Sequence, residues 1–150
     1  MLLFLDFDGV LHPRSPGKNL FIHLSRIQSV LRDFPFLRIV ISSSWREDKS
    51  PQELQALFDK DLRDRIIGTT PLIDIQYPPG PVGHREEEIL IFMAQREYSK
   101  EKWLALDDEA PFFTSECPNL ILCNSATGID DQAERQLRDR LRDELQSATA

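Results

Sequence analysis

Residues 2–10 read Leu-Leu-Phe-Leu-Asp-Phe-Asp-Gly-Val. Four apolar residues in a row, followed at once by acidic residues and a glycine, are typical of a short strand that is buried on both faces. Such strands lie in the middle of parallel sheets, which helices cover on both sides. The stretch therefore predicts a central parallel strand with two carboxylates, Asp6 and Asp8, at its carboxyl end.

The chain that follows supplies neighbours for this strand. Residues 20–33 carry apolar side chains at helical spacing, and residues 37–41 form a β-rich run that ends in three serines. Strand, helix and strand in this order indicate a βαβ unit. The apolar positions of the predicted helix are Leu20, Leu24, Ile27 and Leu31.

The same alternation continues to the end of the chain. Residues 50–53 read Ser-Pro-Gln-Glu, a capping box with proline at the first helical position, so a helix is predicted to begin there. Residues 65–69 predict a short edge strand. Residues 71–83 hold four prolines and two glycines and predict a surface loop. The remaining predictions are a helix from near Arg85, strands at 103–106 and 120–123, and a helix from about Asp130 with Ala133, Leu137, Leu141 and Leu145 on its inner face.

Strands that alternate with helices define the fold class as α/β. We expect one Rossmannoid three-layer domain over residues 1–150, with a parallel sheet doubly wound by helices. A chain of 150 residues with 41% hydrophobic and 29% charged residues can bury one core without a disulfide or a structural metal. Open sheets of this class bind ligands at the carboxyl ends of their strands, so the functional residues should lie there.

Composition excludes several functional classes. A net charge of −7 argues against a broad basic surface for nucleic acid, although it leaves room for the docking of one phosphorylated end. Cys117 and Cys123 lack the spacing of zinc or redox motifs and read as reduced thiols. The apolar run at 2–5 is too short for a signal peptide or a membrane span. We therefore expect a cytoplasmic protein with no membrane insertion and no obligate protein partner.

The two acids after the first strand suit covalent chemistry on a phosphoryl group. On an extended backbone their side chains lie on the same side, roughly 6–7 Å apart. Asp6 then serves as the nucleophile that forms an acyl phosphate, while Asp8 protonates the leaving oxygen and later activates water. Gly9 lets the backbone turn and a ligand approach closely.

Polar residues at two other strand ends complete the predicted site. The Ser42 hydroxyl and the backbone N–H groups after it can hold phosphate oxygens, and Arg46 adds positive charge. Arg85 is the best candidate for a phosphate-neutralising cation, because it sits in a first helical turn, where the helix dipole disfavours a positive residue. Asp107 and Asp108 would repel Asp6 and Asp8 unless a cation lay between them, and oxygen ligands alone favour Mg²⁺.

The order of these residues resembles the haloacid dehalogenase-like (HAD) superfamily, in which Asp-x-Asp-Gly, a strand-end Ser/Thr, a Lys/Arg and an acidic pair follow one another. The resemblance covers nearly the whole chain. It implies Asp6 as nucleophile, Asp8 as acid/base with its backbone carbonyl on Mg²⁺, and Ser42 as phosphate binder. It also implies Arg85 as the cation and Asp107-Asp108 as metal ligands, with Asp108 the more direct one.

Two further features refine the resemblance. Aspartate at position 8 is similar to the phosphatase and phosphotransferase members, since the dehalogenases lack this second acid. The stretches Leu11-His12-Pro13, Ser44-Trp45-Arg46 and Leu106-Asp107-Asp108-Glu109 are similar to the small HAD domains of bacterial RNA-repair (Swiss Army Knife) systems. The spacing of the motifs leaves no room for a separate cap domain, which resembles capless members.

Some assignments stay open at the level of sequence. The third motif of the superfamily is more often lysine, so Lys100 and Lys102 compete with Arg85. We assign Gly9, Ser43, Arg46 and His12 to substrate binding, with His12 at the entrance. Trp45 is interpreted as a packing residue, and the loop at 71–83 as a substitute lid.

The resulting hypothesis is a Mg²⁺-dependent phosphatase that hydrolyses phosphomonoesters through an aspartyl-phosphate intermediate. Its partner is a phosphorylated substrate, for which subfamily resemblance suggests a nucleic-acid terminus or a nucleotide. Two alternatives are a non-catalytic phosphate-binding or interaction module and a receiver-like phospho-acceptor. The receiver alternative predicts adjacent acids on the first strand, whereas Asp6 and Asp8 are separated by one residue.

Overall fold

The computed structural model describes residues 1–74 and 82–149 of the chain. Its described part forms a parallel sheet of five strands in the order β3-β2-β1-β4-β5. The strands are β1 (Leu2–Leu5), β2 (Arg38–Ile41), β3 (Ile66–Thr69), β4 (Trp103–Asp107) and β5 (Leu120–Leu122). The predicted parallel α/β sheet is confirmed, with the first strand at its centre.

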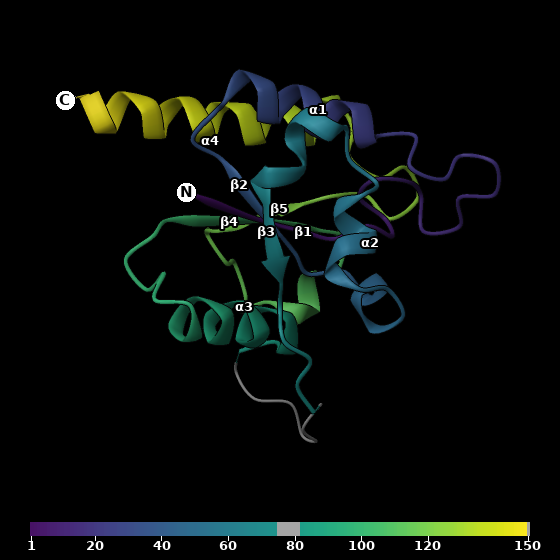
Figure 1. Ribbon diagram of the computed structural model, residues 1–150, viewed down its shortest axis with the longest axis horizontal. Helices are drawn as coiled ribbons and strands as arrows, with labels where there is room; N and C mark the ends of the chain where they lie inside the picture. Colours follow the sequence, from purple (N-terminus) through teal and green to yellow (C-terminus); the bar gives the residue numbers. More distant parts are fainter. Residues whose placement is uncertain (75–81, 150) are drawn as a thin grey trace.

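Helices cover both faces of the sheet (Figure 1). On one face lie α1 (Leu24–Asp33) and α4 (Asp131–Thr149), and on the other lies α3 (His84–Gln95). The residues of β1 alternate between the two sides, since Leu3 and Leu5 belong to the core under α1 and α4, and Phe4 belongs to the core over α3. Both sides of β1 are therefore in the core, which explains why the whole strand is apolar. The described residues form a single domain.

Short helices fill the connections. The capping box predicted at 50–53 is present: Ser50 Oγ accepts a hydrogen bond from the Glu53 N–H, and the Glu53 carboxylate accepts one from the Ser50 N–H. The helix that it begins, α2 (Pro51–Gln55), is short. Among the described residues, the 3₁₀ helices are η1 (Ser44–Glu47), η2 (Lys60–Arg65) and η3 (Ala110–Phe112).

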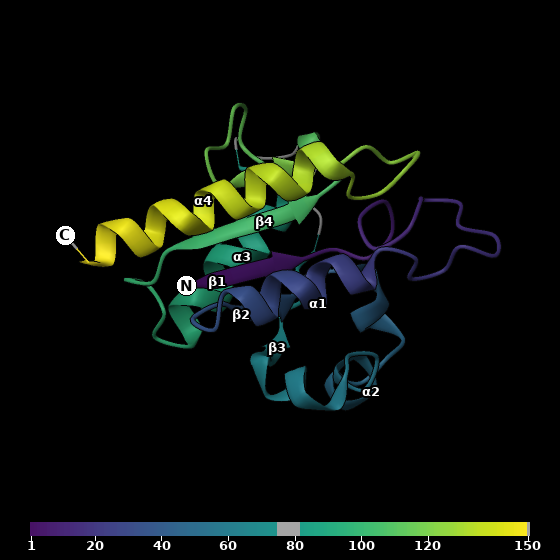
Figure 2. The same ribbon diagram turned by 90° about the horizontal axis from the view of Figure 1, so that it is seen from above.

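Two predicted helix faces are corrected. The helix expected over 20–33 begins at Leu24, because Phe21 has a φ of 57°, which no α-helix accepts, and Leu20 is left 48% exposed in the preceding turn. Leu145 was expected on the inner stripe of the last helix but is 44% exposed. The last turns of α4 extend beyond the strands, so the apolar pattern there has no sheet to contact (Figure 2).

Two further findings concern the predicted lid and the membrane. The lid was predicted at 71–83, and residues 75–81 of it lie outside the described part of the chain. Within the described ranges, no helix combines the length and the apolar character that crossing a membrane demands.

Candidate active site

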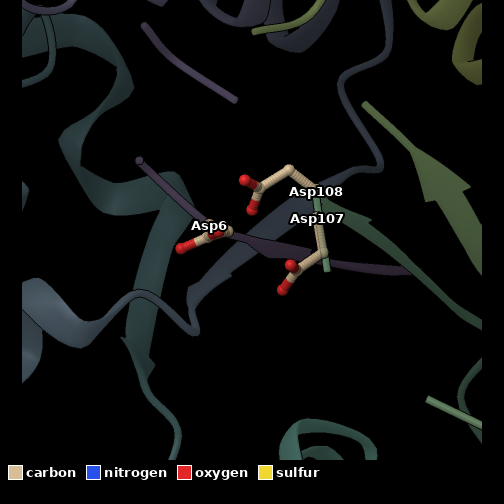
Figure 3. Close-up of side chains that lie close together, drawn as sticks. All are labelled: Asp6, Asp107 and Asp108. Carbon is tan, nitrogen blue, oxygen red and sulfur yellow. The ribbon is translucent and has the colours of Figure 1, made fainter. Parts of the chain in front are cut away.

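Three carboxylates meet at the carboxyl edge of the sheet (Figure 3). Asp6 follows β1 directly, Asp107 is the last residue of the neighbouring strand β4, and Asp108 comes next. One oxygen from each lies within 4.8 Å of the others. Because β1 and β4 are parallel and in register, with Leu5 opposite Leu106, their ends bring these acids together.

Arg85 is the cation that the structure places among these acids. Its Nη1 lies 3.1 Å from Asp6 Oδ1 and 3.0 Å from Asp107 Oδ2. The side chain reaches the acids from the first turn of α3, and its guanidinium packs over the ring of Phe112. The competing candidates lie elsewhere, since Lys102 precedes β4 at the opposite edge of the sheet and its Nζ pairs with Glu144 at 3.0 Å. Lys100 lies at the same distant edge, beside Lys102 around a cavity of about 680 Å³.

Burial perturbs the titration of the acids. Burial and the charge of Asp107 raise the pKa of Asp6 well above its ordinary value, and the nearby Arg85 only partly opposes this. Burial likewise raises the pKa of Asp107 to about 6, again against the influence of Arg85. Arg85 contacts only two of the three clustered carboxylates and does not offset the effect of burial on either, and a bound cation would relieve the remaining repulsion.

The donor set fits a hard divalent ion such as Mg²⁺. All three groups offer carboxylate oxygens, which hard cations prefer. Asp108 Oδ1 is buried without a hydrogen-bond partner among the described residues, although buried carboxylate oxygens are normally paired. The Asp8 side chain is not part of this cluster, so Asp6, Asp107 and Asp108 would supply the side-chain ligands.

Gly9 makes room for the carboxylate of Asp108. The residue has a φ of 77°, and a Cβ built on it would lie 2.1 Å from Asp108 Oδ2. A side chain here would be strained and would also displace Asp108. The sequence predicted that Gly9 lets the backbone turn and a ligand approach closely; the structure shows the turn and a close approach of Asp108.

Asp8 lies apart from the acidic cluster. Its side chain is 40% exposed and borders a pocket of about 350 Å³ that is also lined by Ser44, Trp45, Asp48 and Lys49. His12 Nε2 lies 2.7 Å from Asp8 Oδ1, and Trp45 Nε1 donates to both Asp8 oxygens at 3.2 Å. The interpretation of Trp45 as a packing residue alone missed this contact.

Ser42 takes the place that the sequence predicted, at the end of β2. Its N–H donates to the carbonyl of Leu5 at 3.0 Å, as the Asp6 N–H donates to that of Leu106 at 3.1 Å. The backbone ladder thus continues past the strands and holds Ser42, Asp6 and Asp107 at one edge of the sheet.

Three expected substrate-binding residues are instead supporting residues. His12 has 0% exposure and lies behind Asp8 rather than at the entrance. The Ser43 hydroxyl is buried and accepts the N–H of Trp45 as the cap of η1. Arg46 forms a buried ion pair with Glu88 at 2.5 Å and donates to the carbonyls of Ser42, Ser43 and Thr70. With these donors engaged, Arg46 braces the loop after β2 and does not face a ligand.

Arg14 is a site residue that the sequence did not assign. Its Nη2 lies 2.8 Å from Asp108 Oδ2, and it also pairs with Glu109. Arg14 is 94 residues away from Asp108 along the chain, so no local pattern predicts the contact. Trp45 had a weak local signal, because it lies in the turn that directly follows Ser42 and Ser43.

A parallel sheet with an Asp-x-Asp-Gly turn after its central strand and an acidic pair after the adjacent strand defines a HAD-like domain. A comparison with protein families agrees: residues 2–133 match the family described as the HAD domain in Swiss Army Knife RNA repair proteins. The chain belongs to this family. Searches of curated proteins and of solved structures found no match.

Family membership sets the general activity. A HAD domain of this kind indicates a hydrolase of the phosphatase type, and HAD proteins typically use a divalent metal. The buried triad of Asp6, Asp107 and Asp108 fits such a metal site.

Proposed function

We propose that the protein is a Mg²⁺-dependent phosphomonoesterase that acts through an aspartyl-phosphate on Asp6. The observation that carries this proposal is that Asp6 and Asp8 lie in different surroundings. Asp6 sits inside the cluster with Arg85, while Asp8, two residues later, stands outside it and faces solvent. One carboxylate is thus held as a nucleophile, and the other is free to exchange protons.

In the first half-reaction an Asp6 oxygen attacks phosphorus, and the bond from phosphorus to the leaving oxygen breaks. Asp8, in its protonated form, gives its proton to that oxygen. Arg85 and the N–H groups after Ser42 offset charge on the phosphoryl oxygens. Bound Mg²⁺ would supply positive charge beside the phosphoryl group and keep Asp6 ionised, since an adjacent cation lowers the pKa of a carboxylate.

In the second half-reaction water attacks the phosphorus of the acyl phosphate. The Asp8 carboxylate takes the proton of this water, and the bond from phosphorus to Asp6 breaks. Inorganic phosphate and free Asp6 result, with the proton back on Asp8. The same residue thus serves as acid and then as base, which requires access to both the leaving group and water, and the 40% exposure of the Asp8 side chain supports this role.

The test is hydrolysis of 4-nitrophenyl phosphate with Mg²⁺ by wild type, Asp6→Asn and Asp8→Asn. We expect Asp6→Asn to lose turnover, and Asp8→Asn to accumulate a phosphorylated protein that hydroxylamine cleaves. The matched control is Asp139→Asn, on the exposed side of α4. Equal rates for wild type and Asp6→Asn would refute the proposal.

The same samples separate the alternatives. Binding of Mg²⁺ and phosphate without turnover would favour a non-catalytic phosphate-binding module. A stable phosphoprotein in the wild type would favour a receiver-like acceptor.

For the substrate we propose a phosphorylated nucleic-acid terminus or a nucleotide. The family description refers to RNA repair proteins, and the described residues place no second domain over Asp8. A screen of 3′- and 5′-phosphorylated oligonucleotides, mononucleotides and sugar phosphates tests this. Preference for a sugar phosphate would overturn it.

A further inference from the structure

The side chain of Asp8 is held by two donors that come from different parts of the chain. His12 lies four residues later, and Trp45 comes from η1 after β2. Trp45 Nε1 approaches both oxygens of the carboxylate at 3.2 Å, while His12 adds a second contact to Oδ1 alone at 2.7 Å. Oδ1 is thus engaged twice, and Oδ2 shares one N–H.

The orientation of His12 is itself fixed. The backbone N–H of Phe21 donates to His12 Nδ1 at 3.2 Å, so this nitrogen carries no proton. The single ring hydrogen must then sit on Nε2, from which it is donated to Asp8. His12 is fully buried, so its ring lies behind Asp8 and not on the surface of the site.

The contact that fixes His12 depends on an unusual backbone. Phe21 has a φ of 57°, a conformation that bulky residues rarely adopt. Its ring packs against Trp45 at 5.1 Å and against His12 at 5.2 Å between centroids. The strained residue therefore serves both donors: its N–H orients His12, and its ring supports Trp45.

We infer that His12 and Trp45 are positioning residues that hold the Asp8 carboxyl group in one orientation for its part in the reaction, with Oδ2 the less engaged oxygen. This inference rests on the proposed phosphatase function. Oδ1 is held by two N–H groups, which leaves Oδ2 as the oxygen with the fewer protein contacts. A carboxyl group held in one orientation meets the geometric requirement of general acid catalysis, in which the acid must be aimed at the leaving group.

The first test uses the leaving group as a readout. The value of kcat/KM is measured with Mg²⁺ for 4-nitrophenyl phosphate, whose phenolate leaves readily without a proton, and for phenyl phosphate, which needs one. Trp45→Phe removes the N–H donor and keeps an aromatic ring at this position. We expect kcat/KM to fall roughly tenfold on phenyl phosphate and less than about threefold on 4-nitrophenyl phosphate. A positioned general acid contributes about 10²–10⁴ to the rate, and the variant should lose part of this contribution.

The controls separate positioning from packing. Trp103→Phe alters the other tryptophan, which packs on Phe4 in the core over α3, and should change neither rate. His12→Gln and His12→Phe both leave the Phe21 N–H without its acceptor, but only glutamine can still donate to Asp8. We expect His12→Gln to keep more activity on phenyl phosphate than His12→Phe does.

Two results would overturn the inference. One is an equal loss on both substrates in Trp45→Phe, and the other is ¹⁵N NMR of the Mg²⁺-loaded protein that places the His12 hydrogen on Nδ1. Neither result would refute the proposed phosphatase function, provided that wild type is active and Asp6→Asn is inactive. The NMR result can be read even from a protein without turnover.

Discussion

At the scale of single residues, the main feature of the site is the burial of three carboxylates close to one another. Asp6 and Asp107 are buried with Asp108, and Arg85 is the cation that bridges the first two. Burial opposes the ionised form of each acid, which is why the pKa values of Asp6 and Asp107 are raised. The site is thus costly to fold in its ionised form, and a cation that binds only the folded protein should stabilise it.

This predicts stabilisation by Mg²⁺ that depends on pH. Without metal, Asp107 keeps its proton up to about pH 6, whereas in the unfolded chain it releases the proton near 3.8, so raising the pH through this window weakens the folded state. Mg²⁺ needs the ionised carboxylates, so its effect grows through the same window. At Mg²⁺ about one hundred times its Kd, thermal unfolding at pH 8 should show a rise in Tm of roughly 5–10 °C.

The Mg²⁺-dependent rise in Tm should be much smaller at pH 5. The variant Asp107→Asn should nearly abolish this rise at both pH values. NaCl at matched ionic strength is the control for general screening. An equal rise at pH 5 and pH 8 would contradict the prediction.

The second prediction at this scale concerns Gly9. Gly9→Ala puts a methyl group 2.1 Å from Asp108 Oδ2, so Asp108 must move. We expect Mg²⁺ affinity, measured by calorimetric titration, to fall by about tenfold or more, as when the surroundings of a metal ligand are disturbed. Gly17→Ala is the matched control, because Gly17 also has a positive φ of 54° but its Cβ would meet nothing within 4 Å.

Gly17→Ala should cost about 1 kcal/mol of stability from the backbone alone and leave Mg²⁺ affinity unchanged. If both variants bind Mg²⁺ equally well, the steric role assigned to Gly9 is wrong.

At the scale of elements, one buried arginine ties together the parts that carry the site. Arg46, in η1, donates to the carbonyls of Ser42 and Ser43 after β2 and of Thr70 after β3, and it pairs with Glu88 of α3. The helix that positions Arg85 is thereby joined to the loop that follows Ser42. A buried guanidinium with these partners positions both elements through one side chain.

Removal of the negative charge of Glu88, the partner of Arg46, should therefore lower the stability of the folded protein. Glu88→Gln leaves the Arg46 charge buried and unpaired, so the free energy of unfolding should drop by about 3–5 kcal/mol in urea denaturation. The double variant Arg46→Met, Glu88→Leu should regain part of this, because no unpaired charge remains. Asp139→Asn, which breaks an exposed pair with Arg142, should change little. A cost in Glu88→Gln no larger than in this control would refute the bracing role.

The elements also show what the sequence could predict. Strands such as β1 and the capping box of α2 follow from local pattern, and the structure confirms both. The start of α1 and the exposure of Leu145 were predicted wrongly, because they depend on a left-handed Phe21 and on where the sheet ends. Local periodicity carries neither piece of information.

The candidate site likewise contains residues whose position the sequence predicted and residues whose contacts it did not. Asp6, Ser42, Arg85 and Asp107 lie at ends of strands or helices, where topology alone brings them together. His12, Arg46 and Trp45 were given other roles, because their partners Asp8 and Glu88 could be known only from the packed loops. Roles that rest on side-chain packing between elements are thus the ones that the sequence did not predict.

At the scale of the whole molecule, the sheet has two edges with different chemistry. The carboxyl edge holds the acids and Arg85, and the amino edge holds Met1, Lys100, Lys102 and the last turns of α4. Figures 1 and 2 show both termini of the chain near the amino edge. A cation that acts on the phosphoryl group of the proposed reaction must lie at the carboxyl edge, which favours Arg85 over the lysines that compete with it in the sequence.

The last prediction tests this assignment with two matched substitutions. Arg85→Met removes the guanidinium that contacts Asp6 and Asp107, so kcat/KM for 4-nitrophenyl phosphate should fall by about 10²–10³, the usual effect of losing one preorganised donor. Lys102→Met removes a side chain of similar length whose partner is Glu144, at the opposite edge, and should leave kcat/KM unchanged. Circular dichroism of both variants checks that they fold, and the Mg²⁺-dependent rise in Tm checks that the acids of Arg85→Met still bind metal. Because the two residues lie at opposite ends of the strands, a comparable loss in Lys102→Met would place the functional cation at the amino edge and remove Arg85 from the mechanism.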